Sequence, residues 1–134
     1  MTSLLIVEDN VILATTIERF LRDKGNFTVA AVVPSAEIAL ERLRHLTVDL
    51  LLVDVALPGM NGIDLVTHIQ ELYPQQPCLM LSGHVELYYV RRALEAGARG
   101  YVLKNDPLAI LGAIQQVLAG KIYVSEELRQ KLYH

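Results

Sequence analysis

Short apolar runs alternate along the chain with segments in which apolar residues recur every three or four positions. A continuous apolar run is typical of a strand buried on both faces, and the longer spacing is typical of one face of a helix. The first run, residues 4–7, is followed by a helical spacing over residues 13–21, which ends at Gly25. The pattern therefore predicts a strand followed by a helix, and this pair occurs five times.

The predicted helices begin and end at residues that favour helix termini. Ser35 is placed to cap the second helix, and Asp106 followed by Pro107 gives the fifth helix a cap and a first-turn proline. The helix after the fourth strand is expected to begin near residue 85 and to end at Gly97, and the fifth is expected to end at Gly120. The predicted strands cover residues 4–7, 27–33, 50–53, 78–81 and 101–103.

The order of these elements predicts the fold class. Strands that are apolar on both faces, each followed by a helix, form parallel sheets with helices on both sides. Right-handed crossovers then favour a small, doubly wound, five-stranded sheet of the flavodoxin-like order 2-1-3-4-5. We therefore expect an α/β fold built from five strand–helix units, (βα)5.

Length and composition fit one domain with a short tail. The chain has 134 residues, and its 52% hydrophobic and 20% charged content suffices for a core and excludes intrinsic disorder. We assign residues 1–120 to the domain and residues 121–134 to an exit segment. That segment starts a helix near Ser125, with Glu in its first turn, and stops after roughly two turns at His134, which is typical of a piece of a longer chain.

Charge and cysteine content exclude several classes of function. The formal net charge is −3 and no basic run is present, which argues against direct nucleic-acid binding by this chain. The apolar runs are far shorter than the ~20 residues that span a bilayer, and the N-terminus shows no signal-peptide pattern. The single Cys78 excludes an internal disulfide framework and favours a reducing, cytoplasmic location.

Charged and hydroxyl side chains follow four of the five predicted strands. Glu8 and Asp9 come after the first strand, Asp54 after the third, Ser82 after the fourth and Lys104 after the fifth. In a doubly wound sheet, the functional site lies outside these carboxyl ends of the strands. We therefore expect all five side chains to lie at one edge of the sheet.

This set of side chains favours phosphoryl transfer to a carboxylate. Neighbouring carboxylates repel one another unless a cation neutralises them, and Mg²⁺ binds through one or two carboxylates while it keeps several waters. With the Lys104 ammonium, the ion would create the positive pocket that phosphoryl transfer requires. Asp54 is the best nucleophile, because it stands alone at a central strand end, and its attack on phosphorus would form an aspartyl phosphate.

Four motifs at these strand ends occur together: Glu8-Asp9, Asp54 with Leu57-Pro58-Gly59, Ser82-Gly83, and Tyr101 with Lys104. With them, the chain resembles the receiver domain of a two-component response regulator over essentially its whole length. Residues 93–104 are similar to the LuxR/NarL-type subfamily, whose receivers precede a LuxR-type helix-turn-helix. Residues 120–125 resemble the exit segment of that subfamily.

The resemblance implies a magnesium site and a phosphoacceptor. Asp54 would accept the phosphoryl group from a phosphohistidine of a sensor histidine kinase. Asp9 and Asp54 would ligate Mg²⁺ directly, helped by the backbone carbonyl of Ala56, and Glu8 would act through a water.

The resemblance also implies the residues of the switch. Ser82 would hydrogen-bond one phosphoryl oxygen and Lys104 would pair with another. As Ser82 moves toward the phosphoryl group, Tyr101 would rotate into the space that it leaves and remodel the face made by the fourth helix, the fifth strand and the fifth helix. We further expect His84, two residues after Ser82, to tune the lifetime of the phosphoaspartate. Many receivers have proline after the lysine, where this chain has Asn105, so the geometry of that peptide bond stays open.

The function implied is a switch and not an enzyme, with catalysis limited to its own phosphorylation and slow dephosphorylation. The expected partners are a histidine kinase, a C-terminal DNA-binding output domain beyond this sequence, and a second copy in a phosphorylation-dependent homodimer. A pseudo-receiver that acts only as an interaction module is the main alternative. A haloacid-dehalogenase-type phosphatase would need an Asp at position 56, where this chain has Ala56, and a flavodoxin would not place acidic residues after its first strand.

Overall fold

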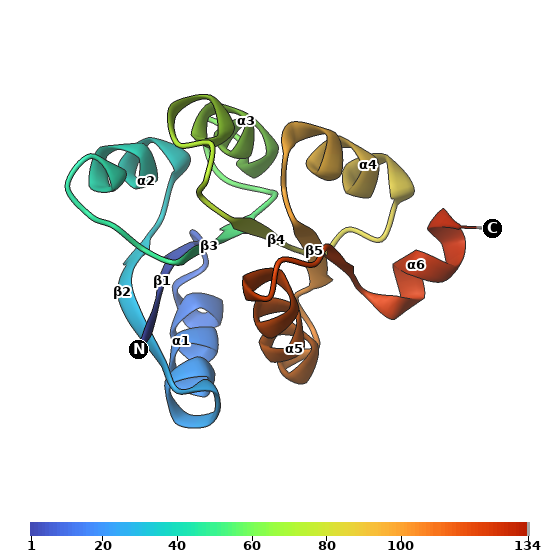
Figure 1. Ribbon diagram of the computed structural model, residues 1–134, viewed down its shortest axis with the longest axis horizontal. Coiled ribbons are helices and arrows are strands. Elements are labelled where there is room, and N and C mark those ends of the chain that lie inside the picture. Colours follow the sequence, from blue (N-terminus) through green and yellow to red (C-terminus); the bar gives the residue numbers. More distant parts are fainter. Residues whose placement is uncertain (134) are drawn as a thin grey trace.

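The computed structural model describes residues 1–133 and contains alternating strands and helices (Figure 1). Every helix lies beside the central sheet or at its edge. The elements in chain order are β1 (Thr2–Val7), α1 (Val11–Gly25), β2 (Phe27–Val33), α2 (Ala36–Leu43), β3 (Leu50–Asp54), α3 (Gly62–Leu72), β4 (Cys78–Ser82), α4 (Leu87–Ala96), β5 (Gly100–Leu103), α5 (Pro107–Leu118), β6 (Tyr123–Val124) and α6 (Glu126–Leu132).

The strands form one parallel sheet in the order β2-β1-β3-β4-β5-β6. The flavodoxin-like α/β class and the order of the first five strands are confirmed. The predicted number of five strands is wrong, because Tyr123–Val124 adds a sixth strand by pairing with β5. This strand comes from the segment after residue 120 that was expected only to leave the domain.

Helices cover both faces of the sheet, as Figure 1 shows: α2, α3 and α4 lie on one side, and α1 and α5 lie on the other. The buried apolar residues of the strands face one of two clusters, because side chains alternate along a strand. Val53 of β3 packs toward α2–α4, for example, and its neighbour Leu52 packs toward α1 and α5. The four inner strands, β1, β3, β4 and β5, therefore carry buried apolar residues on both faces, which explains their apolar runs.

Side-chain caps fix where the helices begin and so hold the loops at the carboxyl ends of the strands. Asn10, Ser35, Asn61 and Asp106 each accept a hydrogen bond from the backbone N–H three residues later, at 2.9–3.2 Å. The caps at Ser35 and Asp106 confirm the predicted helix starts.

Two details of the predicted elements are corrected or completed. Helix α4 begins at Leu87 and not near residue 85, because the two preceding residues belong to the loop after β4, and Glu86 caps the helix without a side-chain hydrogen bond. The Lys104–Asn105 peptide bond is trans.

The chain end packs back onto the sheet. The predicted helix after Ser125 is confirmed as α6, which lies beside α4 beyond the edge of β5 (Figure 1). His134 lies outside the described residues. Among the described residues, no helix has the length and apolar character needed to cross a membrane.

Candidate functional site at the strand ends

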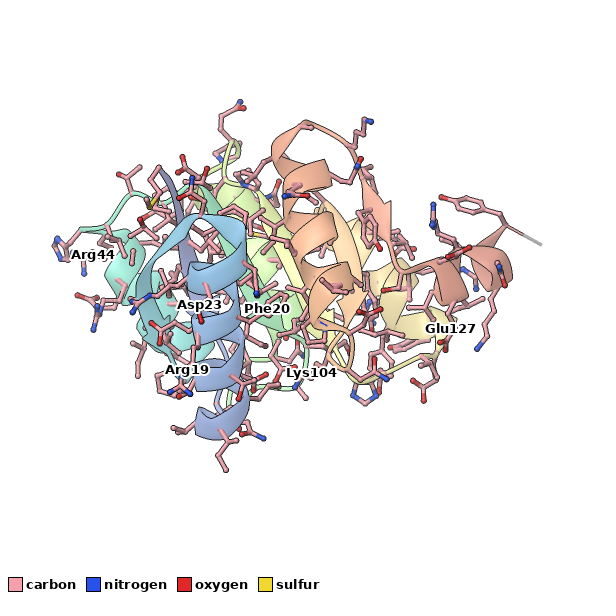
Figure 2. All side chains as sticks on the ribbon, turned by 90° about the horizontal axis from the view of Figure 1, so that it is seen from below. Arg19, Phe20, Asp23, Arg44, Lys104 and Glu127 are labelled. Atoms are coloured by element: carbon pink, nitrogen blue, oxygen red, sulfur yellow. The ribbon has the colours of Figure 1, made fainter. Side chains whose placement is uncertain are left out.

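The predicted site residues lie together at the carboxyl edge of the sheet. Asp54 is the last residue of β3, Ser82 is the last residue of β4, and Glu8 and Lys104 directly follow β1 and β5. Parallel strands in register bring these ends to the same edge, since Asp54 pairs with Leu81 and Ser82 pairs with Leu103. Figure 2 shows Lys104 at the edge of the molecule where these strands end.

The Lys104 ammonium joins two buried carboxylates. Its Nζ lies 3.0 Å from Oδ2 of Asp54 and 3.0 Å from Oε1 of Glu8. Asp54 and Glu8 are each only 2% exposed, whereas a quarter of the Lys104 side chain reaches solvent. The backbone N–H of Ala56 donates to Oδ1 of Asp54 at 3.2 Å, and that of Asn10 donates to Oε2 of Glu8 at 3.1 Å. The Asp54 carboxylate is thus fixed at both oxygens.

Burial and charge shift the protonation of the two flanking groups. Burial raises the pKa of Glu8 to about 7, against the opposing effects of the Asn10 N–H and the Lys104 ammonium. Burial alone would lower the pKa of Lys104, but the adjacent carboxylates of Asp54 and Glu8 outweigh it and raise that pKa. Lys104 therefore stays protonated at neutral pH. Because the pKa of Glu8 is near neutrality, positive charge beside its carboxylate is needed to keep that carboxylate ionised.

The acidic residues fit a hard divalent cation. Glu8, Asp9 and Asp54 each offer a carboxylate oxygen, and these three atoms lie within 4.8 Å of one another. Oε1 of Glu8 accepts no directed hydrogen bond within residues 1–133, although the Lys104 ammonium lies beside it. Asp9 is exposed and gives access from solvent. An all-oxygen set that is open on one side is typical of a Mg²⁺ site, in which the ion keeps several waters.

Ser82 and Tyr101 are linked through the backbone of His84. The N–H of His84 donates to Oγ of Ser82 at 2.9 Å, and the hydroxyl of Tyr101 donates to the carbonyl oxygen of His84 at 3.0 Å. Ser82 and Tyr101 are both fully buried. Burial raises the pKa of Tyr101, and the Ser82 hydroxyl opposes this shift. The Tyr101 ring is thus buried, with its hydroxyl bonded to the loop after β4, and we call this its inward position. It is the position that the resemblance implies the ring reaches when it rotates.

Two structural contributors to the site were missed by the sequence analysis. A Cβ atom at Gly62, the first residue of α3, would overlap the backbone carbonyl of Asp54, so only glycine lets α3 start this close to β3. Glu37 of α2 accepts a hydrogen bond from the N–H of Met60 at 3.1 Å and so holds the loop that follows Asp54. The Asn-Gly pair before the third helical pattern was the available signal for Gly62, whereas Glu37 has no local signal.

The fold and the site define a class of protein: a doubly wound α/β domain with an acidic cluster, a hydroxyl and a lysine at its strand ends. The sequence pattern described as "Response regulator receiver domain" matches residues 4–115. The chain belongs to this family.

Individual relatives agree with this assignment. The transcriptional activator protein ExaE of Pseudomonas putida is 32% identical over 130 residues, which are 96% of this chain and 61% of that protein. The response regulator GacA of Pseudomonas viridiflava is 32% identical over 98% of this chain and 62% of its own length. This chain therefore spans about three fifths of the length of these relatives.

A solved structure extends the likeness to the fold and subfamily. The two-component response regulator of the LuxR family from Aurantimonas sp. SI85-9A1 superposes with a TM-score of 0.94 at 30% identity, over 99% of this chain and 96% of that one. The predicted LuxR/NarL-type receiver is confirmed.

Proposed function

We propose that this chain is a phosphorylation-activated switch in which Asp54 accepts a phosphoryl group from a sensor histidine kinase. The observation that carries the proposal is the buried Asp54 carboxylate, which Lys104 contacts at 3.0 Å beside Glu8 and near Asp9. Family membership supports it, because the acidic cluster, hydroxyl and lysine stand at the predicted strand ends.

The chemistry follows from the placement of these groups. A carboxylate oxygen of Asp54 attacks phosphorus, the phosphorus–nitrogen bond of the kinase phosphohistidine breaks, and the departing imidazole takes up a proton. The Lys104 ammonium and the Ser82 hydroxyl donate to the phosphoryl oxygens and stabilise the charge that gathers there. Asp9, Asp54 and the Ala56 carbonyl would hold Mg²⁺, with Glu8 acting through a water, and the bound ion supplies further positive charge to those oxygens.

The output proposed is transcription control. Curated relatives are transcriptional activators or response regulators that are longer than this chain. We infer that residues 1–120 form the phosphoacceptor domain and that residues 121–134 lead to a LuxR-type DNA-binding domain in the cytoplasm. Phosphorylation would remodel the face of α4, β5 and α5 and would control release of that domain or homodimerisation. Catalysis by the chain would be limited to its own phosphorylation and slow dephosphorylation.

Acetyl phosphate with Mg²⁺ tests the proposal without a kinase. We expect the intact mass to increase by one phosphoryl group, and we expect Asp54→Asn to remove the increase. Asp64→Asn, an exposed aspartate in the first turn of α3, is the matched control and should be labelled like the wild type. A wild type that stays unlabelled, in the presence of a receiver labelled in parallel, would establish the pseudo-receiver alternative.

A further inference from the structure

The C-terminal segment of residues 123–132, which we name the buttress segment, is bonded to the backbone of β5 around Tyr101. Tyr101 pairs with Val124 in the parallel ladder. The N–H of Ser125 donates to the carbonyl of Tyr101 at 3.0 Å, and Oγ of the buried Ser125 accepts from the N–H of Leu103 at 3.1 Å. The buttress segment therefore fixes the backbone of β5 at Tyr101 and at Leu103.

The same segment also packs against the apolar cluster that contains Tyr101. Val124 is 3% exposed and Leu128 of α6 is fully buried, and both belong to the cluster on the side of α2, α3 and α4. Paired residues in parallel strands point to the same face, so Val124 lies beside Tyr101. Helix α6 contacts α4, as its place in Figure 1 shows. The buttress segment thus packs in the same apolar cluster as Tyr101, on the β6 side of that residue.

The hydroxyl end of Tyr101 is connected through His84 to Ser82, which would contact a phosphoryl group on Asp54. The Tyr101 hydroxyl is bonded to the His84 carbonyl, and the His84 N–H is bonded to Ser82 Oγ. The Ser82 hydroxyl can donate its proton to a phosphoryl oxygen while its oxygen goes on accepting from His84. Such donation polarises the hydroxyl and strengthens the bond that it accepts. A phosphoryl group on Asp54 therefore stabilises the inward position of Tyr101.

We propose that Val124, Ser125 and Leu128 are positioning residues for the phosphorylated state of Asp54, acting through the inward position of Tyr101. The inference rests on the function proposed above. The buttress segment stabilises inward Tyr101, which keeps His84 and Ser82 in the arrangement that receives the phosphoryl group. Because coupling between two sites is reciprocal, a group at Asp54 must also stabilise the docked buttress segment.

Beryllofluoride, a phosphoryl mimic, provides the first test, by calorimetric titration in saturating Mg²⁺. We expect Leu128→Ala and Ser125→Ala to weaken beryllofluoride binding by roughly two- to thirtyfold, the range of coupling seen for residues that touch neither ligand. Mg²⁺ affinity measured alone should not change. Gln130→Ala, an exposed position on the same helix, should bind like the wild type.

The affinity measurement separates positioning from a structural role. A residue that only stabilises the fold lowers the melting temperature but leaves the affinity of the folded protein unchanged well below that temperature. If both variants bind beryllofluoride as tightly as the wild type, the buttress inference is wrong and the phosphorylation switch stands. If the wild type does not bind beryllofluoride, the proposed function fails and the inference fails with it.

Hydrogen exchange of the wild-type chain gives a second test that needs no variant to fold. We expect saturating beryllofluoride with Mg²⁺ to slow exchange at the amides of Leu103 and Ser125 and in α6, by a factor similar to the loss of affinity in the variants. Unchanged exchange at these amides, with protection gained only around Asp54 and Ser82, would overturn the coupling.

Discussion

At the scale of single residues, two buried carboxylates, those of Glu8 and Asp54, lie beside one ammonium group, that of Lys104. Two carboxylates at 2% exposure would strongly destabilise the fold if they were ionised without compensation. Lys104 lies 3.0 Å from each of them and carries a single charge, so the site holds a surplus of negative charge when both are ionised. A divalent cation bound beside Glu8, Asp9 and Asp54 would balance this surplus.

The backbone and the side chain of His84 make different contacts. Its backbone links Ser82 to Tyr101, while its ring stacks on Tyr89 with centroids 4.3 Å apart and is 3.7 Å from Oε2 of Glu86. We expect His84→Ala to shorten the phosphoaspartate half-life by a factor of roughly two to ten, equivalent to ~0.4–1.4 kcal/mol in the barrier. The reason is that loss of the ring opens the loop after β4 to water and leaves the backbone bonds in place.

The half-life is measured by loss of radiolabel after rapid removal of the phosphodonor. His68→Ala, an exposed histidine on α3, is the control and should decay at the wild-type rate. A half-life equal to that of the wild type would remove His84 from the control of hydrolysis, and a longer one would mean that the ring assists the attacking water.

The residues of the site were predictable because the hydrophobic pattern fixes where buried strands end, and Asp54, Ser82 and Lys104 stand at those ends. Their mutual geometry was not predictable in the same way. The bridge from Lys104 to Glu8 depends on how two long side chains meet across the ends of β3 and β4, and the inward Tyr101 depends on a carbonyl 17 residues earlier in the chain. Such contacts leave no periodic signal in the sequence.

At the scale of elements, two glycines show why the same residue type has opposite roles in two helices. Gly62 opens α3 against the carbonyl of Asp54, whereas Gly112 lies in the middle of α5 with nothing within 4 Å of a Cβ placed there. Glycine in a helix interior is destabilising by roughly 0.5–1 kcal/mol relative to alanine.

This contrast predicts opposite shifts for one type of substitution. Gly112→Ala should stabilise the protein by roughly 0.5–1 kcal/mol and raise the melting temperature by about 2–4 °C. Gly62→Ala should destabilise it by roughly 1–3 kcal/mol, because the methyl group displaces the backbone of β3. Because that displacement moves Asp54, we also expect slower labelling by acetyl phosphate below the melting temperature.

Thermal unfolding followed by circular dichroism measures the two shifts, and intact mass measures the labelling. Two variants with equal melting temperatures would contradict the packing assigned to α3. Wild-type labelling in a destabilised Gly62→Ala variant would show that the start of α3 does not position the Asp54 carboxylate.

The elements themselves were predictable wherever they were long enough to carry a period. Strand β2 and the start of α2 agree with the sequence pattern because six of the seven residues of Phe27–Val33 are apolar and Ser35 is a cap. Strand β6 was missed because its two residues carry no alternation, and its formation depends on the exposed edge of β5. A two-residue strand is defined by its partner and not by its own sequence.

At the scale of the whole molecule, the central strands connect the two apolar clusters into one structure. Cys78 in β4 is fully buried, and burial raises the pKa of its thiol to about 12. A thiol with this pKa carries almost no thiolate at neutral pH, and no reagent reaches it while the sheet is intact. Its modification therefore requires opening of the central sheet.

The labelling rate of Cys78 therefore reports whether the sheet unfolds globally or locally. For a domain of ~5–15 kcal/mol stability, alkylation in native buffer should be slower than in denaturant by roughly four orders of magnitude or more, because only the globally unfolded fraction reacts. The logarithm of the labelling rate should also rise with denaturant along the slope of global unfolding. In the Cys78→Ala background, Gln75→Cys at an exposed turn is the control and should react at once in both conditions. Fast labelling of Cys78 in native buffer, or a shallower dependence of its labelling rate on denaturant, would mean that β4 detaches while the rest of the sheet persists. The two apolar clusters would then not unfold as a unit.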